Sequence, residues 1–352
     1  MRTVVCAEPG HMTLEQRDPP SCGEGEALLR IRRIGVCGTD IHAYGGNQPY
    51  FSYPRVLGHE LAGEVVEVGR QGNAELIGKR AYVIPYLHCG ECRACRHGRS
   101  NCCQRIQVIG VHRDGGMCDT LAVPLDHLVV SDTLSLDQLA LVECMAIGAH
   151  AVRRSELSQG ELAVVCGVGP IGMGVAQIAR ERGVRVVVID TNPERLAFCR
   201  DKLGLELTLN PAKDDIDAAL KGLSDGELAD VVFDATGNPA AMQAGFDLAG
   251  QGGRYVLVSI VKADISFHDP DFHRKELTLL ASRNATRADF DQVTQLMEGG
   301  RLKADAMITH RAELADVPER MPAWCMPATG VVKAMIELDD NNPRPRAPGA
   351  LP

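Results

Sequence analysis

The sequence predicts an α/β protein of two domains, one an irregular β-barrel and the other a doubly wound parallel sheet. The chain has 352 residues, and at about 150 residues per domain this length gives roughly two domains. Near residue 150 the pattern changes, from short strands broken by glycine and proline to apolar strands separated by helical segments. A hydrophobic content of 45% with 24% charged residues is typical of globular proteins and excludes a disordered or fibrous chain.

The barrel is predicted from the first part of the chain, up to residue 147. Glycines and prolines recur there every few residues, and β-type runs such as EALLRIRRIGV (26–36) and LAGEVVEVG (61–69) alternate with them. Short strands at close intervals with turn residues between them indicate a small, mostly antiparallel barrel.

The parallel sheet is predicted from residues 148–283. Five short apolar strands are expected there: ELAVVCG, VRVVVID, ADVVFDATG, RYVLVSI and LTLLAS. Helical segments separate the first of these, as βαβ crossovers require. The apolar stretch 162–179 contains closely spaced glycines and a proline, so it is interpreted as strand, turn and helix and not as a membrane span.

Residues 284–352 return to mixed structure and are assigned to the first domain. One helix is expected, in ADFDQVTQLMEGG (288–300), because glycines end its amphipathic pattern. The tail NNPRPRAPGALP (341–352) is rich in proline and is expected to be loosely ordered.

Charge and targeting signals limit the partners and the location of the protein. Lysine and arginine number 37 against 46 acidic residues, a formal charge of −9, so a nucleic-acid partner is not expected. The N-terminus lacks an apolar core of signal-peptide length, and a cytoplasmic protein without membrane contact is therefore expected. Under those conditions the 13 cysteines do not form a disulfide framework.

Five of the cysteines are concentrated in CGECRACRHGRSNCC (89–103), within a zinc lobe expected at about 86–106. Cys89, Cys92 and Cys95 are each three residues apart, and Cys103 follows eight residues later. Such spacing lets four thiolates close a tetrahedron, which is typical of a structural zinc site. The adjacent Cys102 is an alternative to Cys103 as the fourth ligand.

A second metal site is predicted from GVCGTDIH (35–42) and PRVLGHELAGEVVEVG (54–69). Cys37, His59 and Glu60 offer a thiolate, an imidazole and a carboxylate. This mixture of ligands suits a catalytic zinc ion with an exchangeable coordination position.

The cofactor site is predicted from ELAVVCGVGPIGMGVAQIAR (161–180), a strand, a glycine turn and a helix. Gly167 permits the tight turn, Gly169 the approach of a pyrophosphate, and Gly172 the close packing of helix on strand. Phosphates are expected to bind at the start of this helix, which includes Pro170 and Ile171, because the first turn of a helix has free backbone N–H groups and a positive potential.

The identity of the cofactor is predicted from the acidic residue that ends the next strand. Asp190 follows Gly167 by 23 residues, and a carboxylate there binds the ribose 2′-hydroxyl of NAD and repels the 2′-phosphate of NADP. Arg195 either weakens this preference or stacks on the adenine. Thr236, in DATGN (234–238), is expected on the nicotinamide side of the crevice.

Together these motifs resemble the medium-chain, zinc-dependent alcohol and polyol dehydrogenases. GVCGTDIH, GHELAGEVVEVG, the four-cysteine segment and GVGPIG occur in the order and spacing of that family and extend over both domains. The resemblance implies a GroES-like catalytic domain (1–147 and 284–352) and a Rossmann NAD-binding domain (148–283). It also implies two zinc ions per chain and a homo-oligomer, a dimer or a tetramer.

The resemblance also implies roles for single residues. Cys37 and His59 correspond to catalytic-zinc ligands, and Glu60 to a ligand that exchanges with water. Thr39 corresponds to the hydroxyl that binds the substrate oxygen and accepts its proton, and His42 to the outer end of the proton relay.

The remaining protein ligand lies in LALVECMAIGAHAVRR (139–154). The family places a glutamate followed by proline here, whereas this chain has Glu143 followed by Cys144. Glu143 is preferred because the flanking residues match the polyol type, and Cys144 is interpreted as a buried apolar residue.

Three segments resemble the branch that acts on sugar acids, of the L-galactonate and L-gulonate 5-dehydrogenase type: 45–60, 108–116 and ASRNAT (281–286). The expected reaction is the reversible oxidation of a secondary hydroxyl of an aldonate or polyol to a ketone, with hydride transfer to NAD. Arg283 is a candidate partner for the substrate carboxylate, or alternatively a residue of the domain interface. Other readings are a sorbitol- or threonine-type dehydrogenase, a zinc-free quinone reductase, which the cysteines oppose, and a non-catalytic NAD-binding sensor.

Overall fold

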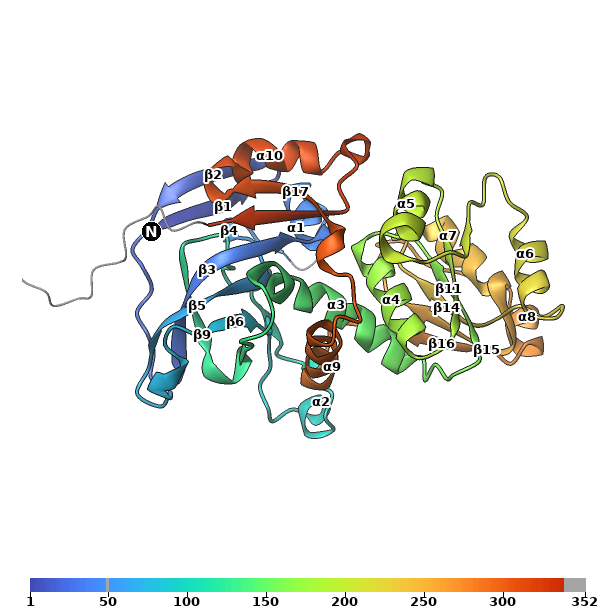
Figure 1. Ribbon diagram of the computed structural model, residues 1–352, viewed down its shortest axis with the longest axis horizontal. Helices are drawn as coiled ribbons and strands as arrows, with labels where there is room; N and C mark the ends of the chain where they lie inside the picture. Colours follow the sequence, from blue (N-terminus) through green and yellow to red (C-terminus); the bar gives the residue numbers. More distant parts are fainter. Residues whose placement is uncertain (49–50, 339–352) are drawn as a thin grey trace, which may run out of the picture.

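The computed structural model describes residues 1–48 and 51–338 and shows two lobes joined by a long helix (Figure 1). The proline-rich tail lies outside the described residues. None of the helices in the described part of the chain is both long and apolar enough to cross a bilayer. The α/β class predicted from the sequence is confirmed.

The first lobe is built on two mostly antiparallel sheets. The smaller has the order β2-β1-β4 and consists of β1 (Arg2–Glu8), β2 (His11–Gln16) and β4 (Arg55–Val56). The larger has the order β10-β6-β5-β3-β18-β17, with β9 also paired to β3. Its strands are β3 (Glu26–Val36), β5 (Glu60–Val68), β6 (Arg80–Val83), β9 (Thr120–Pro124), β10 (Leu128–Val130), β17 (Ile308–Glu313) and β18 (Lys333–Glu337). The C-terminal strand β18 therefore lies directly beside β3.

The second lobe is a parallel sheet with the order β13-β12-β11-β14-β15-β16. Its strands are β11 (Leu162–Cys166), β12 (Arg185–Ile189), β13 (Thr208–Leu209), β14 (Ala229–Asp234), β15 (Ala249–Leu257) and β16 (Thr278–Ala281). The strand order reverses between β11 and β14, the place where doubly wound sheets bind ligands. Five strands match the predicted segments, whereas the two-residue β13 is too short to leave an apolar pattern.

The helices of the second lobe connect these parallel strands (Figure 1). They are α4 (Pro170–Glu181), α5 (Pro193–Phe198), α6 (Ile216–Leu223), α7 (Pro239–Ala244) and α8 (Asp269–Arg274). In the first lobe, α1 (Gly38–Tyr44) and α2 (Arg93–Arg96) are short.

Helix α3 (Leu136–Arg154) connects the two lobes and packs against both α4 and α9 (Arg287–Glu298). It begins with a capping box, in which Ser135 and Gln138 exchange side-chain and backbone hydrogen bonds. A Cβ at Gly148 would lie 2.8 Å from the backbone of Gly174, so only glycine allows α3 and α4 to approach this closely. The helix continues without a break across the division expected at residues 147–148.

The C-terminal segment contains a second helix that was not predicted. The expectation of one helix is correct for α9, but α10 (Val317–Trp324) is also present. Its sequence carries Pro318 in the first turn and Pro322 inside the helix. Proline disfavours an internal helical position, and the burial of Val317, Met321 and Trp324 against the barrel outweighs that cost.

Candidate active site and metal centres

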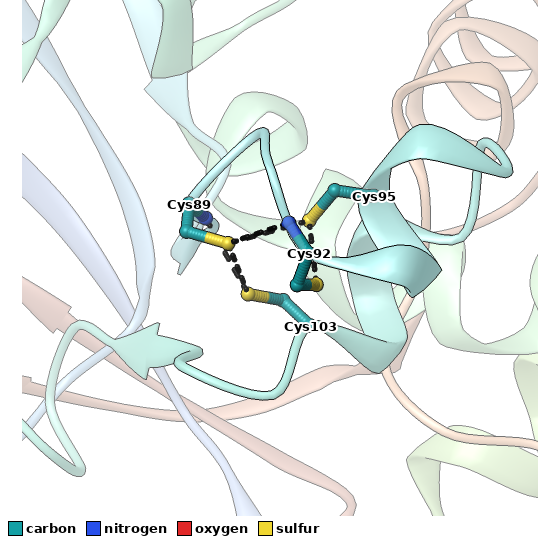
Figure 2. Close-up of side chains that lie close together, drawn as sticks. All are labelled: Cys89, Cys92, Cys95 and Cys103. Carbon is teal, nitrogen blue, oxygen red and sulfur yellow. Dashed lines mark hydrogen bonds between the residues drawn. The ribbon is translucent and has the colours of Figure 1, made fainter.

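The four cysteines predicted to bind structural zinc converge in one loop (Figure 2). The Sγ atoms of Cys89 and Cys103 are 3.4 Å apart, those of Cys92 and Cys95 3.5 Å, and those of Cys89 and Cys95 3.9 Å. A tetrahedral zinc–sulfur site with bonds of about 2.3 Å places its sulfurs about 3.8 Å apart. Cys103 is buried and Cys102 is exposed, so the geometry favours Cys103 over its neighbour.

The backbone of this loop favours thiolates. Hydrogen bonds from the backbone N–H groups of Cys92 and Glu91 lower the pKa of Cys89 to about 5. The N–H groups of Cys95 and Gln104 lower the pKa of Cys92. Removal from solvent raises the pKa of Cys95 to about 12. A dication at the centre of the cluster would offset the repulsion among the sulfurs and allow all four to ionise.

The second ligand set also comes together, at the start of α1 and the start of β5. One ligand atom each of Cys37, His59 and Glu60 lies within 4.8 Å of the others. Nδ1 of His59 is buried and has no hydrogen-bond partner among the described residues. Burial would lower the pKa of His59, but Cys37 and the Asp40 carboxylate outweigh this effect and raise it. The Nδ1 atom lies 3.8 Å from Oδ1 of Asp40, and a buried imidazole among the negative groups of Cys37, Asp40 and Glu60 fits a site for a metal cation.

Asp40 connects the two segments that carry these ligands, and sequence reasoning did not single it out. Its carboxylate is fully buried and accepts hydrogen bonds from the backbone N–H of Cys37 (2.9 Å) and of Gly58 (3.1 Å). Burial raises the pKa of Asp40 above its usual value. The signal was present as the aspartate of GVCGTDIH, three residues after Cys37, where it completes a capping box at the start of α1.

The two candidate carboxylate ligands are held by different partners. Glu60 is bonded through both oxygens to Lys333, with N–O distances of 2.6 and 2.8 Å. Glu143, on α3, accepts a short hydrogen bond from the hydroxyl of Tyr86, and burial raises the pKa of its carboxyl group. Glu143 lies outside the 4.8 Å set, although its charge acts on both His59 and Glu60. Cys144 is fully buried, as its interpretation as an apolar residue requires.

The proposed proton-relay residues lie on α1. Thr39 is half-buried in the first turn, and His42 is exposed in the last turn. Residues three apart on a helix lie on the same face. A proton received at Thr39 therefore has a solvent-exposed acceptor one turn away.

The predicted cofactor residues surround a cavity of about 540 Å³ at the carboxyl ends of the parallel strands. Its lining includes Gly167, Gly169, Asp190, Arg195 and Thr236. The remaining three, Pro170, Ile171 and Gly172, form the first turn of α4. The volume is within the range of about 300–1,000 Å³ found for small-molecule and cofactor sites.

Contacts inside this cavity explain the shape of the turn. Gly167 has φ +85°, and a Cβ at Gly172 would lie 1.9 Å from the Gly167 carbonyl oxygen. The Asp190 carboxylate accepts hydrogen bonds from the backbone N–H groups of Val168 and Asn192, each at 2.8 Å. Both bonds hold the carboxylate at the mouth of the glycine turn, on the side where an adenosine ribose would lie.

Arg195 and Thr236 lie near different glycines of the turn, Gly169 and Gly167 respectively. A Cβ at Gly169 would be 3.6 Å from Nη1 of Arg195, so the guanidinium lies beside the pyrophosphate-binding glycine. Thr236 donates a 2.6 Å hydrogen bond to Asp234 at the end of β14.

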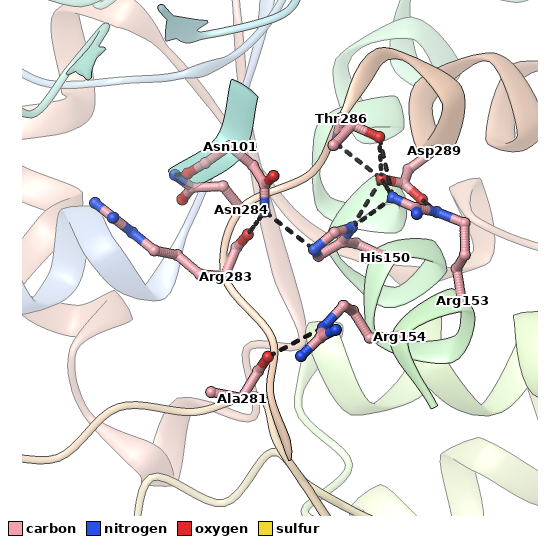
Figure 3. Close-up of polar contacts among 9 residues, drawn as sticks. All are labelled: Asn101, His150, Arg153, Arg154, Ala281, Arg283, Asn284, Thr286 and Asp289. Atoms are coloured by element: carbon pink, nitrogen blue, oxygen red, sulfur yellow. Dashed lines mark hydrogen bonds and ion pairs between the residues drawn. The ribbon is translucent and has the colours of Figure 1, made fainter. Parts of the chain in front are cut away.

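Arg283 follows β16 and is anchored through its backbone (Figure 3). Its carbonyl oxygen accepts a 2.8 Å hydrogen bond from Nδ2 of Asn101, a residue of the cysteine lobe. The side chain points away from the polar network around His150 and Asp289 and is exposed. Among the described residues, no carboxylate pairs with this guanidinium.

The network in Figure 3 joins the cysteine lobe to α3 and α9, and sequence reasoning missed it. Asn101 lies 3.1 Å from Nε2 of His150, whose Nδ1 lies 2.9 Å from Asp289. Arg153 donates two further bonds to Asp289, at 2.7 and 2.9 Å. These residues are far apart in the sequence, so no local pattern marked them.

Basic side chains gather near Arg283. Burial lowers the pKa of His112, and the charges of Arg283 and Arg55 lower it further, which places both guanidinium groups near this imidazole. Nδ1 of His112 accepts a hydrogen bond from the N–H of Val108, which pairs across β7 (Tyr86–Leu87) and β8 (Gln107–Val108) with Tyr86. The Tyr86 hydroxyl bonds to Glu143, so the same strand pair also reaches a candidate ligand of the second metal centre. Asp114, at 3.3 Å from Arg55, offsets part of the charge.

Comparison with known proteins gives consistent results. The alcohol dehydrogenase GroES-like domain family matches residues 23–132, and the zinc-binding dehydrogenase family matches residues 170–299. An L-galactonate-5-dehydrogenase of Escherichia coli K12 is 47% identical over 323 residues, covering 91% of this chain and 95% of that protein. A 2-dehydro-3-deoxy-L-galactonate 5-dehydrogenase of Pseudoalteromonas atlantica is 35% identical over 295 residues, covering 83% and 86%.

Solved structures agree with the fold. A crystal structure from Escherichia coli CFT073, described as a short chain alcohol dehydrogenase complexed with NADH, has a TM-score of 0.90 at 25% identity. A putative zinc-binding dehydrogenase of Sinorhizobium meliloti bound to NADP has a TM-score of 0.89 at 27% identity. Each comparison covers 96% of this chain and 99% of the other.

Proposed function

The chain belongs to the zinc-binding dehydrogenases with a GroES-like domain, and on that basis we propose that it oxidises a secondary hydroxyl of an aldonate. The product is a keto acid, the reaction is reversible, and NAD is the hydride acceptor. The observation that carries the substrate class is the exposed guanidinium of Arg283, which pairs with no carboxylate among the described residues although its backbone is held in place by Asn101. The relatives named for L-galactonate and deoxy-galactonate oxidation support the same choice.

Two zinc ions per chain are part of the proposal. The four-cysteine lobe would hold one with no open position, whereas Cys37, His59 and a carboxylate from Glu60 or Glu143 would hold the other. When bound, the second zinc supplies a Lewis acid that polarises the substrate oxygen, and NAD supplies the hydride acceptor.

The chain's own groups position the substrate and move the proton. Thr39 accepts the proton of the substrate hydroxyl as it gives up its own, and His42, exposed one turn later on α1, releases a proton to solvent. Arg283 orients the substrate through a bidentate pair with its carboxylate. Asp190 favours NAD, because its carboxylate repels a 2′-phosphate.

We propose that the protein is a cytoplasmic homo-oligomer, a dimer or a tetramer. Strand β16 is the edge of the parallel sheet, and the side chains of Thr278 and Leu279 on it are exposed, as is Ile260 at 66%. Exposed strand edges tend to pair with another chain. Light scattering coupled to size exclusion measures the assembly directly, and a monomer at micromolar concentration would contradict it.

The substrate assignment is tested with Arg283→Ala on an aldonate and on a neutral polyol. A charge-assisted hydrogen-bonded pair contributes about 1.5–3 kcal/mol, so the KM for the aldonate should rise about tenfold to a hundredfold. The KM for the polyol should not change, because a polyol has no carboxylate to lose. Arg287→Ala is the control, since Arg287 lies on α9 and pairs with Asp291.

The outcomes separate two claims. If sorbitol-like polyols turn over better than every aldonate tested, the substrate class is wrong and a sorbitol-type activity replaces it. If aldonates are preferred but Arg283→Ala leaves their KM unchanged, the substrate class stands and the role of Arg283 is wrong.

A further inference from the structure

Lys333, the first residue of β18, is buried beside the second metal centre. Only 1% of its side chain is exposed, and Glu60 is fully buried. Its Nζ donates to both carboxylate oxygens of Glu60, at 2.6 and 2.8 Å, and to the carbonyl oxygen of Val36 at 3.2 Å. These three bonds use all three donors of an ammonium group, and Val36 directly precedes the candidate ligand Cys37.

The position of this lysine matters because the site is rich in negative charge. A thiolate at Cys37 and carboxylates at Glu60 and Glu143 would bring three negative charges around one dication. The ammonium of Lys333 offsets the one negative charge that remains when a dication is bound by these three groups. It bonds directly to Glu60, whereas the Glu143 carboxylate is held by the neutral Tyr86 hydroxyl and is affected by the lysine only through its charge.

The residues around Glu60 restrict the positions that its carboxylate can take. Gly35 faces Glu60 across β3 and β5, and a Cβ there would lie 1.9 Å from Oε2. The carboxylate contacts the ammonium directly and also has an oxygen within 4.8 Å of ligand atoms of Cys37 and His59. A cation bound by Cys37 and His59 would compete with Lys333 for the same two oxygens.

We infer that Lys333 is a positioning residue that competes with the metal for the Glu60 carboxylate and so keeps Glu60 a replaceable ligand. Glu143, with Tyr86 as its partner, is then the permanent carboxylate ligand. The position that Glu60 leaves open is the one that the substrate oxygen takes. This inference rests on the proposed zinc site of Cys37 and His59, but not on the identity of the substrate.

The test compares zinc release from Lys333→Met, Lys333→Arg and the wild-type protein to an excess of a chromophoric chelator, without substrate. Without the ammonium, Glu60 should bind the metal permanently, and zinc release from the second site should slow about tenfold or more, the size of effect typical of groups around a metal's ligands. Release from the four-cysteine lobe should not change and serves as the internal control. Lys333→Arg should restore wild-type release, because it keeps the cation.

Cobalt substitution gives a second measurement that a merely structural role of Lys333 would not alter. Entry of a carboxylate should shift the visible absorption bands of cobalt at the second site in Lys333→Met. Adding Glu60→Gln to Lys333→Met should reverse both the shift and the slow release. An unchanged spectrum with unchanged or faster zinc release in Lys333→Met would overturn the inference.

Glu60→Gln alone keeps the inference open to refutation even if Lys333→Met does not fold. It should leave zinc release from the second site close to wild type, since Glu60 is not a permanent ligand. Rapid loss of that zinc would make Glu60 a permanent ligand and refute the role of Lys333. A protein whose zinc content does not change on Cys37→Ser would instead contradict the proposed zinc site itself.

Discussion

Asp289→Asn tests the network that connects the cysteine lobe with α3 and α9. The Asp289 carboxylate is fully buried and accepts bonds from Arg153 (2.7 and 2.9 Å) and from the backbone and hydroxyl of Thr286, each at 2.8 Å. His150 lies 2.9 Å away and is itself buried. The substitution keeps the shape of the side chain, removes its charge and replaces an acceptor oxygen with a donor.

The size of the effect follows from which partners are buried. Removing one partner of a fully buried charged pair costs about 3–5 kcal/mol. The Arg153 side chain is 43% exposed and can return to water, whereas His150 and the N–H of Thr286 lose an acceptor inside the protein. We therefore expect a loss of about 2–3 kcal/mol in the free energy of unfolding, below the fully buried case.

The effect should also depend on pH. Burial alone would raise the pKa of Asp289, but the hydrogen bonds from Arg153 and His150 outweigh it and hold that pKa well below its usual value. A carboxyl group with a lowered folded-state pKa stabilises the fold fully above its unfolded pKa, about 3.9, and loses this contribution as the pH falls below that value. The difference between wild type and Asp289→Asn should therefore be full at pH 7 and shrink below about pH 4.

Urea unfolding followed by circular dichroism at pH 7 and at pH 3.5 measures both effects. The matched control is Asp291→Asn, since Asp291 lies on the same helix and forms an exposed pair with Arg287 at 2.8 Å. That pair should contribute about 0.5 kcal/mol or less. If Asp289→Asn is no more destabilising than Asp291→Asn, or if its deficit grows toward low pH, the account of the network is wrong.

Two further predictions concern the metals and the cofactor. Elemental analysis should find two zinc ions per chain, and one or none in protein never exposed to a chelator would contradict the two-site proposal. Cys92→Ser should lose the lobe zinc and destabilise the lobe, Cys37→Ser should abolish turnover with the fold intact, and Cys102→Ser should do neither. The kcat/KM with NAD should exceed that with NADP. Asp190→Ala should weaken this preference, because the repulsion of a 2′-phosphate disappears. An equal or greater kcat/KM with NADP in the wild-type protein would refute the role of Asp190.

Sequence alone predicted the groups of the candidate sites that are local in the chain, and the structure brings those groups together. The ligands of the cysteine lobe fall within 15 residues, so their spacing already limits how they can converge. The glycine turn could also be predicted from the sequence, since Gly167 and Gly172 are required by the close backbone contacts within one strand–turn–helix unit. The sequence already favoured Cys103 and left Cys102 as an alternative, and the structure disfavours that alternative because Cys103 is buried and Cys102 is exposed.

Tertiary structure decided everything that depends on contacts between distant segments. Lys333 reaches Glu60 across 273 residues because β18 pairs with β3, and Asn101 reaches the carbonyl of Arg283 across 182. Neither contact produces a periodic pattern or a motif in the sequence. Each depends on how two distant segments pack together and not on the pattern of residues within either segment. The sequence thus determined which chemical groups are present, whereas the fold decided which of them lie close enough to form ion pairs and hydrogen bonds.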